Sequence, residues 1–230
     1  VYKPFEGMRS YQPKPKLDLS AVRSAAQLIN SAKKPLVLFG QGVILSNAEQ
    51  EFKQFIEKSG IPSAWTIMGL SALDSDHYLN VGMLGMHGNY APNKLTNECD
   101  VLIAVGMRFD DRVTGDLSRY AKQAKIIHIE IDPAEIDKNV KTDVAVLGDA
   151  KEALLELTEA IQLRDHSGWL KDFRNLESEE YDTVIREELN PSLDELTMGE
   201  VIQAINEKTN GDAIIVTDVG QHQMVSCRYA

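Results

Sequence analysis

Short apolar runs without polar alternation recur along the chain. They cover residues 35–39, 62–66, 79–84, 100–105, 125–131 and 144–147. A strand that is buried on both faces has no polar side, so such runs are typical of a parallel sheet with helices on each face. The pattern therefore predicts a doubly wound, Rossmann-like α/β fold with a six-stranded parallel sheet.

The segments between these runs have helical patterns. Residues 20–32 repeat apolar side chains at helical spacing, and these are Val22, Ala25, Ala26 and Ile29. Ser46 and Glu49 form a capping-box pattern before a second apolar helical segment. A further helix is expected to begin at Asp149. Strands that alternate with helices in this way place residues 17–163 in one doubly wound domain.

The remaining residues have a different character. Residues 1–16 are rich in proline and predict an extended linker, and residues 164–196 are rich in charge and predict a helical linker. A second capping box at Thr197 and an apolar run at 213–217 predict a helix and then a buried strand. We therefore interpret residues 197–230 as the incomplete start of a second domain.

Composition and charge narrow the class of protein. The 230 residues are 43% hydrophobic and 26% charged, and the net charge of -11 disfavours nucleic acid or an anionic membrane as partner. Two cysteines are too few for a disulfide framework or a zinc cluster. No apolar run approaches the roughly 18 residues that suggest a membrane span. We expect a cytoplasmic protein, and the start at Val1 suggests an internal piece of a longer chain.

A pair of glycines follows the first predicted strand. Gly40, Gln41 and Gly42 stand where doubly wound sheets bind ligands, and glycine lets backbone N–H groups approach a phosphate. The third glycine of the dinucleotide fingerprint is missing, because Leu45 occupies its place. The alternative interpretation is a pair of turn glycines without a ligand.

Two loops flank the predicted strand at 100–105. The first contains Gly85, Met86 and His87, and the second runs from Gly106 to Arg112 with two arginines and two aspartates. Arginine suits both bidentate phosphate contact and stacking on flat rings. The two loops therefore predict a cleft for an anionic, planar ligand. The alternatives are a solvated loop histidine and a loop that forms only its own salt bridges.

Two carboxylates follow later strands. Glu130 ends the fifth predicted strand, where an acid commonly accepts hydrogen bonds from ribose hydroxyls. Asp149 is expected to cap the helix that it begins, and it could also face the adenosine end of a ligand.

The histidines and the missing reactive groups limit the chemistry. His128 lies between isoleucines and is expected in the core, whereas His77 and His166 are expected at the surface. We identify no side chain as a catalytic acid, base or nucleophile, and no spacing of metal ligands. A domain of this kind leaves the chemistry to a cofactor or to another part of the protein.

Taken together, these segments resemble the catalytic (large) subunit family of acetolactate synthase, also called acetohydroxyacid synthase. The matching segments are residues 8–11, 40–42, 84–88, 100–112, 128–133, 148–149 and 219–224. They span almost the whole chain in one order. The resemblance implies the central FAD-binding domain of that family, the connecting helices, and the start of its thiamine-diphosphate domain.

The resemblance also implies an activity. The intact enzyme would condense pyruvate with pyruvate or 2-oxobutyrate in branched-chain amino-acid biosynthesis, using thiamine diphosphate and Mg²⁺, with FAD in a structural role. Its partners would be its own N- and C-terminal domains, further catalytic subunits in a homodimer or homotetramer, and a small regulatory subunit. This chain alone would be inactive and at most bind FAD.

The family's cofactor contacts carry over to named positions. The FAD contacts implied are Gly40, Gln41, Gly42, Thr66, Leu84, Gly85, Met86, His87, Gly106, Met107, Arg108, Asp110, Arg112, Val113, Glu130, Ile131, Asp149 and Ala150. The residues implied at the diphosphate of thiamine diphosphate are Val219, Gly220, Gln221 and His222. Two other interpretations remain: a related thiamine-dependent oxo-acid decarboxylase or pyruvate oxidase, and a stand-alone nucleotide-binding module.

Overall fold

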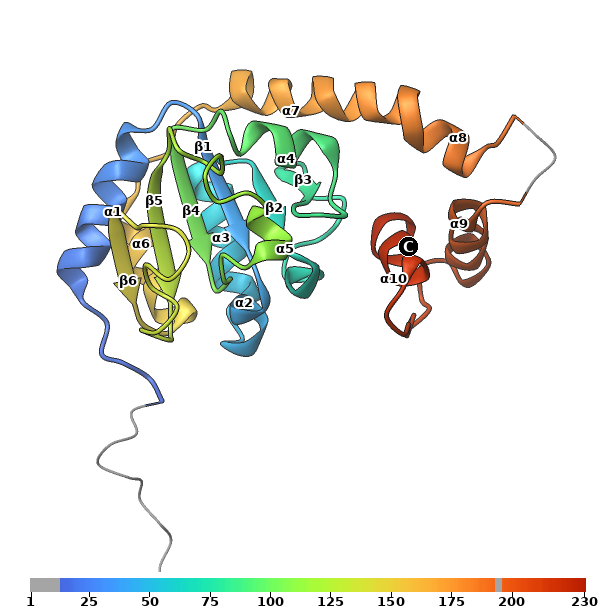
Figure 1. Cartoon of the computed structure of the whole chain (residues 1–230). Coiled ribbons are helices and arrows are strands. Elements are labelled where there is room, and N and C mark those ends of the chain that lie inside the picture. Colours follow the sequence, from blue (N-terminus) through green and yellow to red (C-terminus); the bar gives the residue numbers. More distant parts are fainter. Residues whose placement is uncertain (1–12, 193–195) are drawn as a thin grey trace, which may run out of the picture.

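A six-stranded, all-parallel sheet forms the centre of the molecule (Figure 1). The computed structural model describes residues 13–192 and 196–230. The strands follow the order β3-β2-β1-β4-β5-β6. Their bounds are β1 Pro35–Phe39, β2 Ser63–Trp65, β3 Asn80–Met83, β4 Val101–Val105, β5 Lys125–Glu130 and β6 Val144–Leu147. The doubly wound, Rossmann-like fold that the apolar runs predict is therefore confirmed.

Helices connect the strands and cover both faces of the sheet. Those before and between the strands are α1 Leu19–Ser31, α2 Gln41–Leu45, α3 Glu49–Ser59, the 3-10 turn η1 Ile67–Gly69, α4 Tyr90–Leu95 and α5 Asp111–Thr114. Those after β6 are α6 Ala150–Ala160, α7 Ser167–Glu180, the π-helical turn η2 Tyr181–Ile185, α8 Arg186–Leu189, α9 Met198–Thr209 and α10 Gln221–Tyr229.

The sheet has a separate apolar core on each face. Alternate side chains of β1 divide between the two, so that Val37 faces one core and Leu38 the other. Helices α1, α3 and α6 pack on the first face, and α4 and α7 pack on the second. Trp169 of α7 is buried there and donates its Nε1–H to the carbonyl of Pro35 at 2.9 Å. The start of the predicted helical linker thus packs directly on the sheet.

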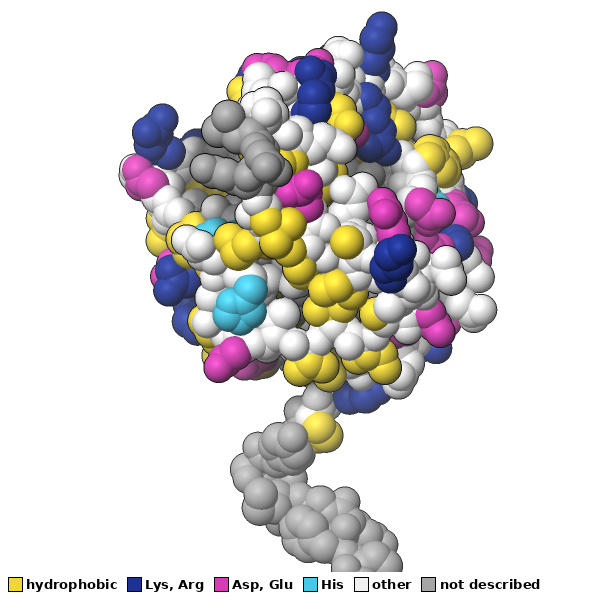
Figure 2. Space-filling view, turned by 90° about the vertical axis from the view of Figure 1, so that its right-hand side faces the viewer, with side chains coloured by type: hydrophobic (Ala, Val, Ile, Leu, Met, Phe, Trp, Pro, Cys, Tyr) yellow, Lys and Arg dark blue, Asp and Glu magenta, His cyan; other side chains and the backbone are white. Residues whose placement is uncertain are grey.

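The C-terminal helices extend away from the sheet. Helix α7 continues through η2 into α8, and α9 and α10 lie beyond that end (Figure 1). Helix α9 begins with the capping box that the sequence predicts, in which Thr197 and Glu200 cap each other. Apolar side chains remain exposed over this side of the molecule (Figure 2).

The strand expected at 213–217 does not form. Residues 213–217 have no regular secondary structure, and Ile214 and Val216 are 93% and 87% exposed. An apolar run becomes a buried strand only where a neighbouring strand pairs with it, and no described residue pairs with this segment.

Three smaller expectations are also wrong. Ser46 is the C-cap of α2, a short helix that the sequence analysis does not predict, and α3 has Ala48 as its N-cap, so no capping box forms with Glu49. His77 and His166 are not surface side chains. The side chain of His77 is 8% exposed and its Nδ1 accepts the N–H of Leu79, while His166 is buried at the start of α7.

The close packing of one glycine gives a test of this fold. A Cβ on Gly42 would lie 2.5 Å from the Cα of Gly106, so G42A forces two backbone segments apart. We expect it to lower the free energy of unfolding by about 1–3 kcal/mol, the usual range for overpacking. The matched control is G168A in α7, where a Cβ meets nothing within 4 Å. This control is expected to be neutral or to stabilise by up to about 1 kcal/mol. Urea denaturation measures both, and equal stability of the two variants would contradict the packing.

Candidate functional site

Most of the sequence-predicted site residues lie at one edge of the sheet. In a parallel sheet all strands end at the same side, and ligands bind there. The residues found at or shortly after the ends of the six strands are Gly40, Gln41, Gly42, Thr66, Leu84, Gly85, Met86, His87, Gly106, Met107, Arg108, Asp110, Arg112, Val113, Glu130, Ile131, Asp149 and Ala150. These residues are far apart in the sequence, and the fold brings them to one edge of the sheet.

The centre of this edge lies between β1 and β4, where the winding of the sheet reverses. The N–H of Gly42 donates to the carbonyl of Gly106 at 2.8 Å, and the N–H of Gly40 donates to the carbonyl of Val105 at 3.1 Å. Both N–H groups are therefore used within the protein. Both glycines also allow close contact between the two turns, because neither position has room for a Cβ.

The two loops that flank β4 in sequence are joined by the backbone. The N–H of Met86 donates to the carbonyl of Arg112 at 2.8 Å. Gly85 has a positive φ of 112°, and a Cβ there would lie 2.8 Å from the same carbonyl. Asn93 of α4 binds both the N–H and the carbonyl of Gly85, at 2.9 and 2.8 Å. This fixed backbone leaves the side chains of Met86 and His87 exposed.

The second loop presents positive charge. Asp110 caps α5 by accepting the N–H groups of Arg112 and Val113. Arg108 lies 3.7 Å from Asp110 and keeps 63% of its side chain exposed. Arg112 is exposed and forms no ion pair with a described residue. The loop is thus only weakly paired with itself, and its arginines are accessible to an anion.

Glu130 and His128 form the wall beside this loop. Oε1 of Glu130 accepts the N–H groups of Ile131 and Asp132, and Oε2 lies 3.8 Å from Nε2 of His128. His128 is fully buried, as the sequence predicts, and its Nε2 is 2.9 Å from the carbonyl of Met107. Burial lowers the pKa of His128, so the imidazole is neutral near pH 7 and its Nε2–H donates to that carbonyl.

Asp149 has two partners. One oxygen accepts the N–H of Lys151 and caps α6, as the sequence predicts. The other lies 2.7 Å from Nζ of Lys14. A ligand could reach this carboxylate only by displacing or sharing Lys14, whose side chain is largely exposed. The matching residues 8–11 lie outside the described residues.

Residues 219–222 stand apart from the edge. They precede and begin α10, whose N-cap Gly220 makes no side-chain capping bond. The N-terminal N–H groups of such a helix favour an anion. No hydrogen bond between described residues joins this turn to the strand ends.

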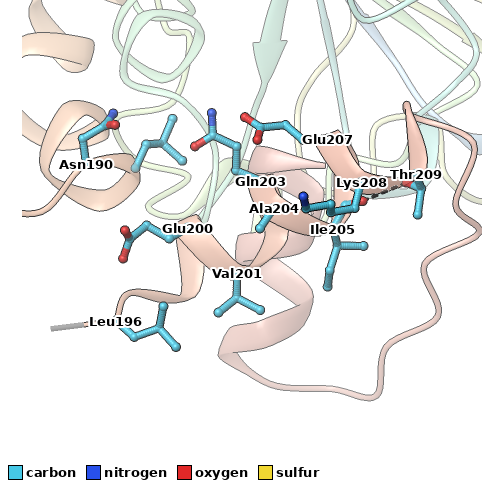
Figure 3. A pocket seen from close by; sticks show the side chains of 11 residues that line it. Asn190, Leu196, Glu200, Val201, Gln203, Ala204, Ile205, Glu207, Lys208 and Thr209 are labelled. Atoms are coloured by element: carbon cyan, nitrogen blue, oxygen red, sulfur yellow. Dashed lines mark hydrogen bonds between the residues drawn. The ribbon is translucent and has the colours of Figure 1, made fainter.

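Neither prominent cavity coincides with the edge. The larger one, of about 760 Å³, lies between the end of α8 and helix α9, lined by side chains such as Leu196, Val201 and Ile205 (Figure 3). A smaller cavity of about 300 Å³ lies between the β2–β3 side of the sheet and α10, and Trp65, Arg174 and Cys227 line it. Thr66 is one of the predicted cofactor contacts. It is buried, and it directly follows Trp65, which lines the smaller cavity.

Two findings on the described part of the chain concern metal ions and membranes. Within residues 13–192 and 196–230, no three His, Cys, Asp or Glu side chains come close enough to hold a metal ion. No helix in those ranges has the length and apolar character needed to cross a bilayer.

Several residues that shape the edge are not predicted from the sequence. Asn93 holds Gly85, Asn89 accepts the N–H of Met83 through Oδ1 at 2.9 Å, and Asn139 donates to the carbonyl of Phe109 at 2.7 Å. The partners of these asparagines are backbone groups 6, 8 and 30 residues away in the sequence, so no local spacing identifies the asparagines. Asn89 alone carries a signal, because asparagine before a helix is a common N-cap.

Comparison with known proteins gives consistent relatives. The chain is 42% identical over 219 residues to a probable acetolactate synthase large subunit of Methanocaldococcus jannaschii, covering 93% of this chain and 37% of that protein. It is 36% identical over 232 residues to the acetolactate synthase isozyme 3 large subunit of Escherichia coli, covering 96% and 39%. The acetolactate synthase large subunit of Corynebacterium glutamicum is 37% identical over 237 residues, covering 100% and 37%.

The chain thus spans less than two fifths of the length of these curated relatives. Residues 22–157, which contain the whole sheet, match the family model described as thiamine pyrophosphate enzyme, central domain. The chain therefore belongs to the thiamine pyrophosphate enzyme family, and its six-stranded sheet is the central domain of that family.

Proposed function

We propose that the carboxyl edge of the sheet binds FAD. The observation that carries this proposal is the joining of two loops, 84–88 and 106–112, by the bond between Met86 and Arg112 beside the point where the winding reverses. This joined rim carries exposed arginines on one side and the buried Glu130 on the other. FAD has a diphosphate, a ribose and flat rings, and each finds a matching group there.

The chemistry of the donor set fits this ligand. Arg108 and Arg112 supply cations for the diphosphate or stack on a flat ring. Glu130 accepts a ribose hydroxyl through Oε2, because Oε1 is already used by the backbone. Asp149 faces the adenosine end if Lys14 shares it. Gly40 and Gly42 contribute contact through their shape, since their N–H groups are occupied. FAD supplies structure rather than net redox chemistry in this proposal.

The intact protein is proposed to be the catalytic subunit of an acetolactate synthase. Three relatives that match nearly all of this chain are named as acetolactate synthase large subunits, one of them as a probable one. Such an enzyme condenses pyruvate with pyruvate or 2-oxobutyrate for branched-chain amino-acid biosynthesis, and thiamine diphosphate with Mg²⁺ supplies the carbon–carbon chemistry. In this chain the uncapped N-terminus of α10, with residues 219–222, is proposed to receive the diphosphate of that cofactor.

The organisation of the chain follows from this proposal. Residues 17–163 form the FAD-binding domain, 1–16 and 164–196 are linkers, and 197–230 begin the thiamine-diphosphate domain. The partners would be the protein's own remaining domains, other catalytic subunits in a homodimer or homotetramer, and a small regulatory subunit in the cytoplasm. The chain of 230 residues alone binds FAD at most and has no synthase activity.

Loss of one arginine tests the FAD site. We expect R108M to weaken FAD binding at least tenfold, because a hydrogen bond to a charged group contributes about 1.5–3 kcal/mol. Quenching of flavin fluorescence during titration measures the affinity. The matched control is R23M on α1, which removes the same charge at an exposed position outside the proposed FAD contacts. Equal FAD affinity of R108M, R23M and the unaltered chain would refute the assigned contact.

Activity tests the proposed parent enzyme. The intact protein, supplied with FAD, thiamine diphosphate and Mg²⁺, is expected to convert pyruvate into acetolactate, which acid converts to measurable acetoin. The R108M form should need more FAD for half-maximal activity and recover at saturating FAD. A folded, cofactor-loaded intact protein that forms no acetolactate would exclude the synthase assignment, whatever the FAD titration shows.

A further inference from the structure

Glu180 is a buried carboxylate that two distant segments share. It is the last residue of α7, lies directly before the π-helical turn η2, and is only 6% exposed. Each carboxylate oxygen has a different partner. Oε2 accepts the backbone N–H of Tyr90 at 3.0 Å, and Oε1 accepts from the guanidinium of Arg228. A buried carboxylate with both oxygens committed holds its partners in fixed positions.

The first partner belongs to the helix behind one candidate cofactor loop. Tyr90 begins α4, whose N-cap Asn89 makes no side-chain capping bond because its Oδ1 accepts the N–H of Met83 instead. Glu180 therefore supplies the missing cap from another helix, with the charge that a helix N-terminus favours. Helix α4 in turn carries Asn93, which binds both backbone groups of Gly85 in loop 84–88.

The second partner, Arg228, belongs to the helix that follows the turn at 219–222. Arg228 lies in α10, which begins immediately after Gly220, and its side chain is 18% exposed. The neighbouring Tyr229 donates its hydroxyl to Glu188 of α8, which adds a second attachment of α10 to the same helical segment. Because α10 is one continuous helix of nine residues, fixing its C-terminal end also orients the turn at 219–222.

We infer that Glu180 is a positioning residue that holds the Leu84-containing loop and the turn at 219–222 at a fixed spacing, by tying α4 to α10. The inference rests on the proposed function, which assigns these two segments to cofactor binding. The contacts of Glu180 with Tyr90 and Arg228 do not depend on any cofactor. Cys227 lies beside it, packs against the first core and lines the cavity between α10 and the sheet. Release of α10 would therefore expose this thiol.

The reactivity of the two cysteine thiols measures whether Glu180 holds α10 in place. Cys99 is fully buried, and burial raises the pKa of its thiol to about 12, so it does not react with a maleimide in the folded chain. Cys227 is half-buried and is the reporter. E180Q keeps an oxygen for the N–H of Tyr90 but removes the charge that holds Arg228, and R228M removes the other partner. We expect both variants to raise the rate of Cys227 labelling at least tenfold.

The matched control is E179Q, the same change at the exposed neighbouring position, and it should label at the rate of the unaltered chain. Labelling of Cys99 separates release of α10 from global unfolding, since only unfolding exposes both thiols. Equal Cys227 rates in E180Q, R228M and E179Q, with Cys99 protected throughout, would overturn the inference.

FAD provides a readout that a merely structural contact would not change. In the unaltered chain, saturating FAD should slow Cys227 labelling at least threefold, because binding at loop 84–88 stabilises α4 and the tie to α10. The same FAD should have no such effect on E180Q or R228M. If FAD binds and never alters the Cys227 rate, the positioning role is refuted. If FAD does not bind at all, the proposed FAD site fails, while the rates without FAD still decide whether Glu180 holds α10.

Discussion

The contact between two backbone turns, one after β1 and one after β4, governs the arrangement of the candidate site. These strands are neighbours in the sheet at the point where the winding reverses, and the first residues of the two turns that follow them are in direct contact. Gly42 and Gly106 approach until neither has room for a Cβ, and the N–H of one donates to the carbonyl of the other at 2.8 Å. Larger residues would separate the turns and open the edge.

From this contact, further bonds extend across the edge in both directions. Toward β5, the buried His128 holds the carbonyl of Met107 and stands beside Glu130. Toward β3, the carbonyl of Arg112 holds the N–H of Met86. Polar contacts to backbone groups thus fix the loop backbones and leave the arginine side chains accessible. A rim that is rigid in its backbone and cationic in its side chains suits a large anionic cofactor more than it suits catalysis by the protein's own groups.

The pattern of the sequence was sufficient for the sheet but not for all of the site. The apolar runs at 100–105 and 125–131 become β4 and β5 with shifts of one residue, because burial on both faces leaves an unmistakable run. The run at 213–217 is equally apolar and forms no strand, since a strand needs a pairing partner that no local pattern supplies. Asp149 caps its helix as expected, whereas the pattern at Ser46 gives no capping box because α2 ends there.

The resemblance to known enzymes named positions, and the structure gives physical reasons for some of them. Gly42 matches a motif, yet its N–H is occupied and its role is close packing. Asn93 and Glu180 matter for the loop at 84–88 although neither belongs to a motif, since they act through backbone groups distant in sequence. Such contacts depend on the tertiary fold, so the spacing of residues along one sequence does not predict them.

Hydrogen exchange of backbone amides, with and without FAD, tests the central claim that the joined rim is the cofactor site. Saturating FAD is expected to slow exchange in peptides covering 84–88 and 106–113, and to leave α1 and α3 on the first face of the sheet unchanged. FAD binding that protects other segments and leaves both of these loops unchanged would contradict it.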